Sequence, residues 1–255
     1  MTESELTETY AQTVQRLASA QKGAARGAPA YSIYVNRRLG RYLAAACFRA
    51  RLTPNAVTAI SAVFTFLGIA LIALVAPSWW AGTTIALLLA TGYAFDSADG
   101  QVARLRGGGS VAGEWLDHVV DCVKVTCLHL AVLISFFRFR DFSDPAFLLV
   151  PMGYTVVAVT VFFALILNDQ LKTGQLKTGR DVVAEISLSE VSPRPSTLRR
   201  SLLVLPTDYG VLCLIFFTLG CPPIFFTLYS VMFALNTVHL VLALRKWFRD
   251  MVALN

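Results

Sequence analysis

The sequence carries little charge for its length. Asp, Glu, Lys and Arg make up 15% of its 255 residues, whereas ordinary soluble domains contain about 25%. Hydrophobic residues make up 56%, the mean hydropathy is +0.60, and the apolar residues gather in long runs. This composition excludes a conventional soluble domain and indicates a polytopic membrane protein that forms one compact helical bundle.

Three other kinds of sequence feature are missing. None of the five cysteines forms a CxxC pair, and all lie in or beside apolar runs, so we interpret them as small buried hydrophobic residues. Residues 1–30 lack an apolar core, so no signal peptide is expected. No nucleic-acid-binding motif accompanies the net charge of +6, so we expect no nucleic-acid partner and interpret the basic residues as a membrane-topology signal.

Six apolar segments are predicted to be transmembrane helices, because a span needs about 20 apolar residues. They cover about residues 54–77, 79–96, 113–137, 147–167, 203–219 and 223–244, of which the fifth is short. Before them, residues 31–55 place apolar residues at helical spacing between five arginines. This pattern predicts an amphipathic juxtamembrane helix that lies in the lipid headgroup region, with an ordinary solvated helix end as the alternative.

The predicted fold class is therefore all-α, with a polar, flexible segment over residues 1–30 and one membrane domain over residues 31–255. Of the 22 Lys and Arg residues, 19 fall on one side of the six spans, including six in a loop at about 169–202. The positive-inside rule places that side and both termini in the cytoplasm, and an even number of spans agrees with it. Within the loop we expect a membrane-surface helix or disorder.

Acidic residues gather in one short segment between the second and third spans. Asp96 and Asp99 are three residues apart and share a helix face at the end of the second span. Asp117 and Asp121 are four residues apart and share a helix face near the start of the third span. Four carboxylates that converge at low dielectric repel each other and lose hydration, and one or two divalent cations relieve both problems. All-oxygen ligands favour Mg²⁺ or Mn²⁺, which commonly hold phosphates, so we expect a substrate with a pyrophosphate group.

The residues around the acids suit a phosphate-bearing substrate. Gly100 lets the backbone approach it, and Arg104, on the loop side, offers a planar fork for a phosphate oxygen. The glycines of residues 107–109 then turn the chain back into the third span. A carboxylate that is not fully engaged with metal can take the proton of an attacking hydroxyl.

Together these residues form a pattern with fixed gaps, Asp96-x2-Asp99-Gly100-x2-Ala103-Arg104-x8-Gly113-x3-Asp117-x3-Asp121. At every position it resembles the signature of the CDP-alcohol phosphotransferase family, and the resemblance extends over about residues 31–245. It implies an integral membrane enzyme with six spans after an amphipathic helix. It also implies metal-dependent transfer of a phosphatidyl or substituted phosphoryl group from a CDP-linked donor to an acceptor hydroxyl. CMP is released, and the product is a phospholipid or a related phosphodiester.

Two sets of residues take roles from this resemblance. The ligands of two Mg²⁺ or Mn²⁺ ions would be Asp96, Asp99, Asp117 and Asp121, unless Asp121 is the general base. The nucleotide would be bound by Gly100, Ala103, Arg104, Gly113, Asn55 and Thr58. Family members are typically homodimers, so we expect a homodimer in a bacterial cell membrane with its active site facing the cytoplasm.

The stretch GEWLDHVVD resembles the version of the motif in choline and ethanolamine phosphotransferases. Glu114 and His118 could form a hydrogen-bonded pair near the acceptor, in which His118 shares the role of base with Asp121. Alternatively, Glu114 satisfies the helix N-terminus and His118 packs nearby. Lys124 would bind a phosphate on the acceptor or neutralise the acids. For Asp208 the alternatives are a place in the same cavity and a helix cap.

Several functions stay open on the sequence alone. A CDP-diacylglycerol donor could transfer a phosphatidyl group to a small polar alcohol, a soluble CDP-alcohol could transfer its head group to diacylglycerol, or both partners could be polar. The alternative from another class is a divalent-cation transporter with intramembrane carboxylates. A transporter leaves Gly100 and Arg104 unexplained, and the second half of the chain has no counterpart of the acid cluster.

Overall fold

The computed structural model describes residues 8–19, 29–139, 145–177 and 205–253, and every regular element in this part of the chain is helical. The α-helices are α2 (Tyr10–Ser19), α3 (Arg37–Arg49), α4 (Pro54–Leu74), α5 (Trp79–Leu105), α6 (Val111–Phe139), α7 (Leu149–Lys177), α10 (Tyr209–Ile215) and α11 (Pro222–Val252). Short π-helical or 3-10 turns lie at Ser32–Asn36, Pro145–Leu148, Leu205–Thr207 and Phe216–Gly220. The predicted all-α fold is confirmed. Most of the loop at 169–202 lies outside the described residues.

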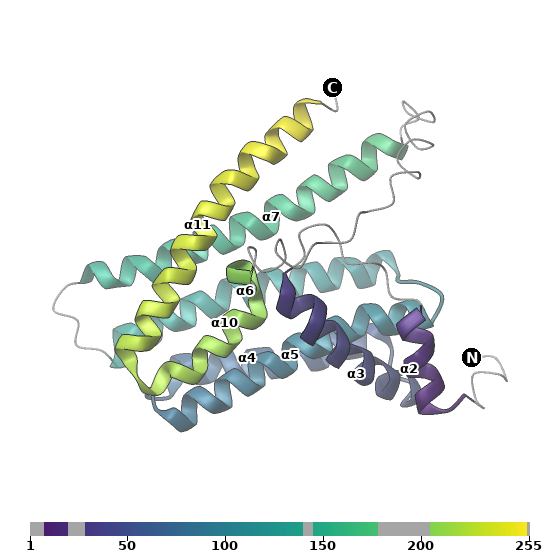
Figure 1. Cartoon of the computed structure of the whole chain (residues 1–255), viewed down its shortest axis with the longest axis horizontal. Helices are drawn as coiled ribbons and strands as arrows, with labels where there is room; N and C mark the ends of the chain where they lie inside the picture. The colour runs from purple at the N-terminus through teal and green to yellow at the C-terminus, as the bar shows by residue number, and fades with distance from the viewer. Residues whose placement is uncertain (1–7, 20–28, 140–144, 178–204, 254–255) are drawn as a thin grey trace.

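Helices α4, α5 and α6 lie side by side along the lower half of Figure 1, and α7 and α11 extend from them towards the upper right. Helix α3 packs on α5, and α2 packs on α3. The right-hand end of the bundle in Figure 1 therefore gathers the start of α4, the end of α5 and the start of α6. These three helix ends carry the sequence motif.

Local sequence signals set these helix ends. The hydroxyl of Thr53 accepts a hydrogen bond from the Ala56 N–H at 3.2 Å, and Pro54 follows as the first residue of α4. Between α5 and α6, Gly107 and Gly108 have φ angles of 88° and 132°, which side chains other than glycine rarely adopt. The glycines therefore allow the tight reversal that returns the chain to the bundle.

Four helices in the described part of the chain are long and apolar enough to cross a membrane, namely α4, α6, α7 with its preceding turn, and α11. Helix α5 is long, at 27 residues, but its second half carries two acids of the motif, Asp96 and Asp99. The apolar stretch Tyr209–Gly220 is short. The expected number of six spans therefore stays a prediction. Helix α5 also continues to Leu105, whereas the predicted span ended at 96, so Arg104 lies on the helix and not in a loop.

The buried face of α4 carries more polar side chains than its exposed face. On α4 the buried side includes Thr58, Ser61 and Thr65, which are 5% exposed or less, whereas Leu67 and Leu74 are 52% and 63% exposed. Small and polar residues between helices, with leucine on the outside, are typical of helix bundles in lipid. The distribution of side chains thus agrees with an integral membrane protein.

Asp208 joins two helix N-termini. One of its carboxylate oxygens accepts a hydrogen bond from the Gly210 N–H at 2.9 Å and caps α10. The other accepts a hydrogen bond from the Ser32 N–H at 2.8 Å, in the turn that leads into α3. The side chain is only 2% exposed, so both contacts are shielded from water. Its contacts are those of a helix cap, one of the two roles that the sequence left open.

We predict that Asp208→Ala lowers the stability of the folded protein by about 2–4 kcal/mol, because it removes a helix cap and leaves the Ser32 N–H without an acceptor. Thermal unfolding of the purified protein in detergent measures the change. Ser78→Ala is the matched control, because the exposed Ser78 hydroxyl caps only α5, with the Ala81 N–H at 3.1 Å. It should cost about 1 kcal/mol. Equal losses in the two variants would contradict the double role of Asp208.

Candidate functional site

A cavity of about 640 Å³ opens where α4 begins, α5 ends and α6 begins. The predicted site residues that line it are Asn55, Thr58, Asp99, Gly100, Ala103, Gly113, Glu114 and Asp117. The structure thus brings residues from three helices to one cavity. It is large enough for a small-molecule ligand, because such pockets commonly measure about 300–1,000 Å³.

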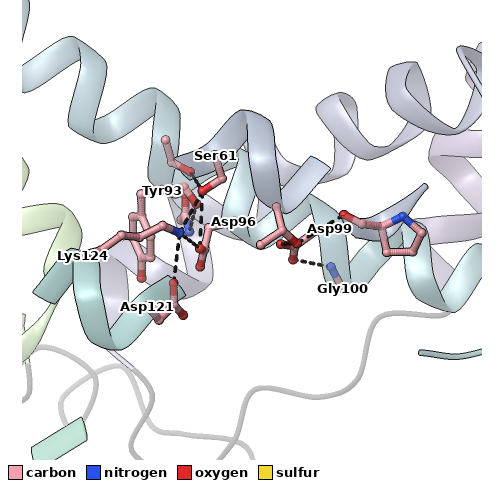
Figure 2. Close-up of polar contacts among 11 residues, drawn as sticks. Ser61, Tyr93, Asp96, Asp99, Gly100, Asp121 and Lys124 are labelled. Atoms are coloured by element: carbon pink, nitrogen blue, oxygen red, sulfur yellow. Dashed lines mark hydrogen bonds and ion pairs between the residues drawn. The ribbon is translucent and has the colours of Figure 1, made fainter. Parts of the chain in front are cut away.

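Three of the four motif aspartates approach one another closely. One carboxylate oxygen from each of Asp96, Asp99 and Asp117 lies within 4.8 Å of the others. Asp99 is 6% exposed, and it accepts hydrogen bonds from the Thr58 hydroxyl at 2.7 Å and the Gly100 N–H at 2.6 Å (Figure 2). These two bonds fix the orientation of the Asp99 carboxylate.

The three carboxylates fit a hard divalent cation. One oxygen of Asp117 is buried without a hydrogen-bond partner, which is costly unless a ligand satisfies it. A donor set made only of carboxylate oxygens is typical of Mg²⁺ or Mn²⁺ rather than zinc. Asp96, Asp99 and Asp117 are therefore the residues that would hold such an ion.

Lys124 enters the acid cluster from α6. Its ammonium donates hydrogen bonds to Asp96 at 2.6 Å, to Asp121 at 3.0 Å and to the Ser61 hydroxyl at 3.0 Å (Figure 2). The side chain is buried, with 6% of its surface exposed. Asp121 is thus engaged in an ion pair and is not part of the close group formed by the other three aspartates. These contacts are the ones expected of a lysine that neutralises the acids.

The two arginines near the motif occupy different environments. Arg104 is exposed and does not line the cavity, although its Nη1 lies 3.9 Å from where a Cβ on Gly100 would be. Arg106, which the sequence analysis did not single out, does line the cavity. Its guanidinium donates to the Leu52 carbonyl at 2.9 Å and lies 6.0 Å above the Phe48 ring. Only its place just beyond the motif could have drawn attention to it in the sequence.

Glu114 and His118 form a loose pair at the surface. Glu114 Oε1 and His118 Nε2 are 3.9 Å apart, which is longer than a hydrogen bond. The two side chains are 60% and 38% exposed, respectively. Glu114 lines the cavity, whereas His118 does not contribute to its wall.

Gly113 keeps the cavity open at the start of α6. A Cβ at this position would lie 3.0 Å from Asn55 Oδ1 and 3.1 Å from Ser110 Oγ, which is tighter than ordinary contacts. Ser110 in turn caps α6, because its hydroxyl accepts a hydrogen bond from the Gly113 N–H at 3.0 Å. Any larger residue at Gly113 would therefore displace the helix cap or the Asn55 side chain.

Ser61 is a site residue that the sequence analysis missed. Besides its contact with Lys124, its hydroxyl lies 2.8 Å from the Gly92 carbonyl and 3.4 Å from Asp96 Oδ1. A signal for it was present in the sequence. Thr58, Ser61 and Thr65 recur at spacings of three and four in an otherwise apolar segment, so they share one helix face.

A second cavity, of about 410 Å³, lies between α6, α7 and α11. Much of its wall is apolar and includes Leu128, Phe162 and Met232. Tyr93, which also lines it, lies next to Lys124 in Figure 2. The wall of this second cavity is more apolar than that of the first cavity.

Comparison with known families identifies the class of protein that these features define. Residues 51–245 match the family model of the CDP-alcohol phosphatidyltransferases. The match covers more than half of the chain, so the protein belongs to this family. It is accordingly a membrane enzyme that transfers phosphate-containing groups in phospholipid synthesis. The transporter alternative finds no support.

Solved structures with a similar fold include phosphatidylinositol phosphate synthase (PgsA1) of Mycobacterium tuberculosis. Its complex with manganese and citrate is 20% identical and has a TM-score of 0.50, with 81% of this chain and 87% of that chain covered. The same synthase with CDP-DAG bound is 20% identical, with a TM-score of 0.49 and coverage of 84% and 94%. At this level of identity the likeness shows the fold alone. No curated protein sequence matches the chain.

We predict that Thr58→Val weakens Mn²⁺ binding about 10-fold to 100-fold, because Asp99 loses the hydroxyl that orients it. Titration of the purified protein with Mn²⁺, followed by the EPR signal of the free ion, measures the affinity. Thr58→Ser keeps a hydroxyl and should bind nearly as well as wild type. Thr65→Val is the control on the same buried face of α4 and should leave the affinity unchanged. A loss of equal size in the Thr65 variant would show that the effect comes from packing.

Proposed function

We propose that the protein transfers a phosphatidyl group from a CDP-linked lipid donor to the hydroxyl of a polar acceptor and releases CMP. The observation that carries this proposal is the cavity, where two motif aspartates, two motif glycines and the start of α4 meet. Membership of the CDP-alcohol phosphatidyltransferases supports the CDP-linked donor. Phosphatidylinositol phosphate synthase is the function of the similar solved structure, which makes phosphorylated polyols the first acceptors to test.

The reaction forms a bond between the acceptor oxygen and the donor's β-phosphorus and breaks the bond from that phosphorus to CMP. The proton of the acceptor hydroxyl passes to a side chain. We propose Asp121, with His118 sharing the role, as that base, and both lie on α6 beyond the residues that line the cavity. A divalent cation, held by Asp96, Asp99 and Asp117 when bound, would supply Lewis-acid polarisation of the phosphate oxygens. The chain itself holds these three carboxylates in place and positions the nucleotide beside them.

We assign the nucleotide to the part of the cavity between α4, α5 and the start of α6. Asn55 offers an amide there, and Gly100 and Gly113 leave room for the ligand. Thr58 acts on the site through its hydrogen bond to Asp99. Arg104 lies next to Gly100 and would reach a diphosphate oxygen from outside the cavity wall.

The second cavity favours the substrate patterns that include a lipid. Its apolar wall suits an acyl chain better than it suits a second polar partner. The excess of Lys and Arg on one side of the spans supports a cytoplasmic active site and cytoplasmic termini. We further propose that the enzyme acts as a homodimer in a bacterial cell membrane.

We predict that Arg104→Gln raises the KM for the CDP-linked donor about 10-fold, with a smaller change in kcat, because a charge-assisted contact to the bound donor is lost. CMP release at varied donor concentrations separates the two constants. Arg106→Gln is the matched control, because its guanidinium is already engaged with Leu52 and Phe48. It should change the KM less and lower the thermal stability instead. A larger KM effect in the Arg106 variant would reverse the two assignments.

We predict that Asp117→Asn lowers CMP release by about 10²–10³-fold or more, because it removes a charge that the site needs during the transfer. The assay uses purified protein, Mg²⁺, CDP-diacylglycerol and a panel of acceptors that includes inositol phosphate and glycerol phosphate. Asp250→Asn is the control, since Asp250 pairs with Lys172 at 3.2 Å on other helices. It should keep wild-type activity. Divalent-cation flux in liposomes without CMP release from any CDP-alcohol would overturn the proposed function.

A further inference from the structure

The second cavity, between α6, α7 and α11, has no positive charge on its wall. None of the described residues that line it is Lys or Arg. Asp208 is the one acid among them, and its two carboxylate oxygens already accept hydrogen bonds from the N–H groups of Gly210 and Ser32. A phosphate group placed there would meet no cation, and burying an unpaired charge is costly. The cavity therefore suits an uncharged ligand, or the uncharged part of a larger one.

A buried histidine on this wall has one nitrogen without a partner. His129 is 2% exposed, and its Nδ1 lies 2.7 Å from the hydroxyl of the fully buried Tyr229. The tyrosine donates in this bond, because its proton would otherwise be buried without an acceptor among the described residues. The ring is neutral, since a buried charge without a counter-ion is costly, so its single proton is on Nε2. Nε2 is thus an N–H donor with no acceptor in the described part of the chain.

Two tyrosine hydroxyls of the same wall also have protons to donate. The Tyr154 ring stacks on His129, with ring centres 4.0 Å apart, and its hydroxyl accepts a hydrogen bond from Asn236 Nδ2 at 3.1 Å. The proton of the Tyr154 hydroxyl is left to donate. The hydroxyl of Tyr209 is buried, and no oxygen or nitrogen of the described residues accepts from it. The cavity therefore offers several unpaired donors to an uncharged acceptor.

An ester carbonyl is the acceptor that matches these donors. It carries no charge and no proton, whereas each hydroxyl of a polyol would bring a further donor that also needs a partner. The apolar part of the wall, which includes Leu128, Phe162 and Met232, suits the fatty-acyl chain attached to such a carbonyl. The chemistry of the wall thus points to a fatty-acyl ester.

The cavity begins one helical turn from the acid cluster. Tyr93 lines it and precedes Asp96 by three residues on α5, and Val125 lines it and follows Asp121 by four residues on α6. Residues at these spacings share a helix face. A lipid whose phosphate group lies at the aspartates would therefore have its glycerol esters on the side of this cavity.

We propose that the second cavity binds an acyl ester group of the lipid substrate, with His129 and Tyr154 as the donors to its carbonyl oxygen. The inference rests on the proposed function, since that function supplies a donor with a diacylglycerol unit. Tyr229 is then a positioning residue, because it keeps the proton of His129 on Nε2. The enzyme should prefer an ester-linked lipid to an ether-linked one, because an ether has no carbonyl oxygen.

Kinetics with a matched pair of lipids test this preference. CMP release is measured at varied concentrations of CDP-diacylglycerol and of CDP-dialkylglycerol, its diether, with chains of the same length. For the wild type, the KM for the diether should be about 10-fold higher, because the diether leaves the buried donors unpaired. The double variant His129→Phe/Tyr229→Phe removes both partners of one bond and strands neither. It should lower this ratio of KM values to about threefold or less.

Three single variants complete the series. His129→Gln keeps an N–H donor and should retain most of the 10-fold ratio. Tyr154→Phe keeps the stacked ring but loses the hydroxyl, so it should lower the ratio to about threefold even where the double variant does not fold. His239→Phe is the control, because it removes a histidine of α11 that does not line this cavity, and it should leave the ratio unchanged.

Direct binding separates this inference from the proposed function. Thermal unfolding in detergent is followed with diacylglycerol or its diether, neither of which carries CDP. The wild-type Tm should rise at least twice as much with the ester, and the double variant should lose the difference. This result without CMP release from any CDP-linked lipid would support the cavity assignment and overturn the proposed function. In an active enzyme, equal KM values for the two donors, or an ester preference that survives in the double variant or in Tyr154→Phe, would overturn the inference and leave the proposed function intact.

Discussion

The structure depends on holding four carboxylates from two helices together inside a membrane protein. Such charges repel one another and lose hydration, so they are stable only next to positive charge. Lys124 supplies part of that charge from within the chain and binds one aspartate on each helix, Asp96 and Asp121. Two backbone features help to gather the carboxylates, namely the reversal between α5 and α6 and the capped start of α4. Together they bring three helix termini to one place.

Helix α4 supports the acid cluster although it contributes no acid. Thr58 orients Asp99 through a hydrogen bond of 2.7 Å, and Ser61 accepts a hydrogen bond from Lys124 one turn further along. The opposite face of the same helix exposes leucine. This segment reads as a uniform apolar span in the sequence, but its two faces differ in polarity. The first half of its buried face carries polar residues, and two of them, Thr58 and Ser61, bind groups of the site.

The sequence predicts contacts within one helix better than contacts between helices. The spacing of Asp96 and Asp99 predicts a shared face, and the family resemblance led to residues that line one cavity. The bond between Lys124 and Asp96 joins positions 28 residues apart on two helices, and periodicity does not tell which neighbour a long side chain meets. The exposure of the Arg104 side chain was also not predicted, because it depends on the continuation of α5 beyond the predicted end of the span.

The four motif aspartates also differ in their access to the open cavity. Asp99 and Asp117 line it, so a cation or a substrate that enters there meets them first. Asp96 and Asp121 face Lys124, whose ammonium is buried and fully bonded. The fixed charge of Lys124 therefore lies with Asp96 and Asp121, away from the cavity through which a ligand would reach Asp99 and Asp117.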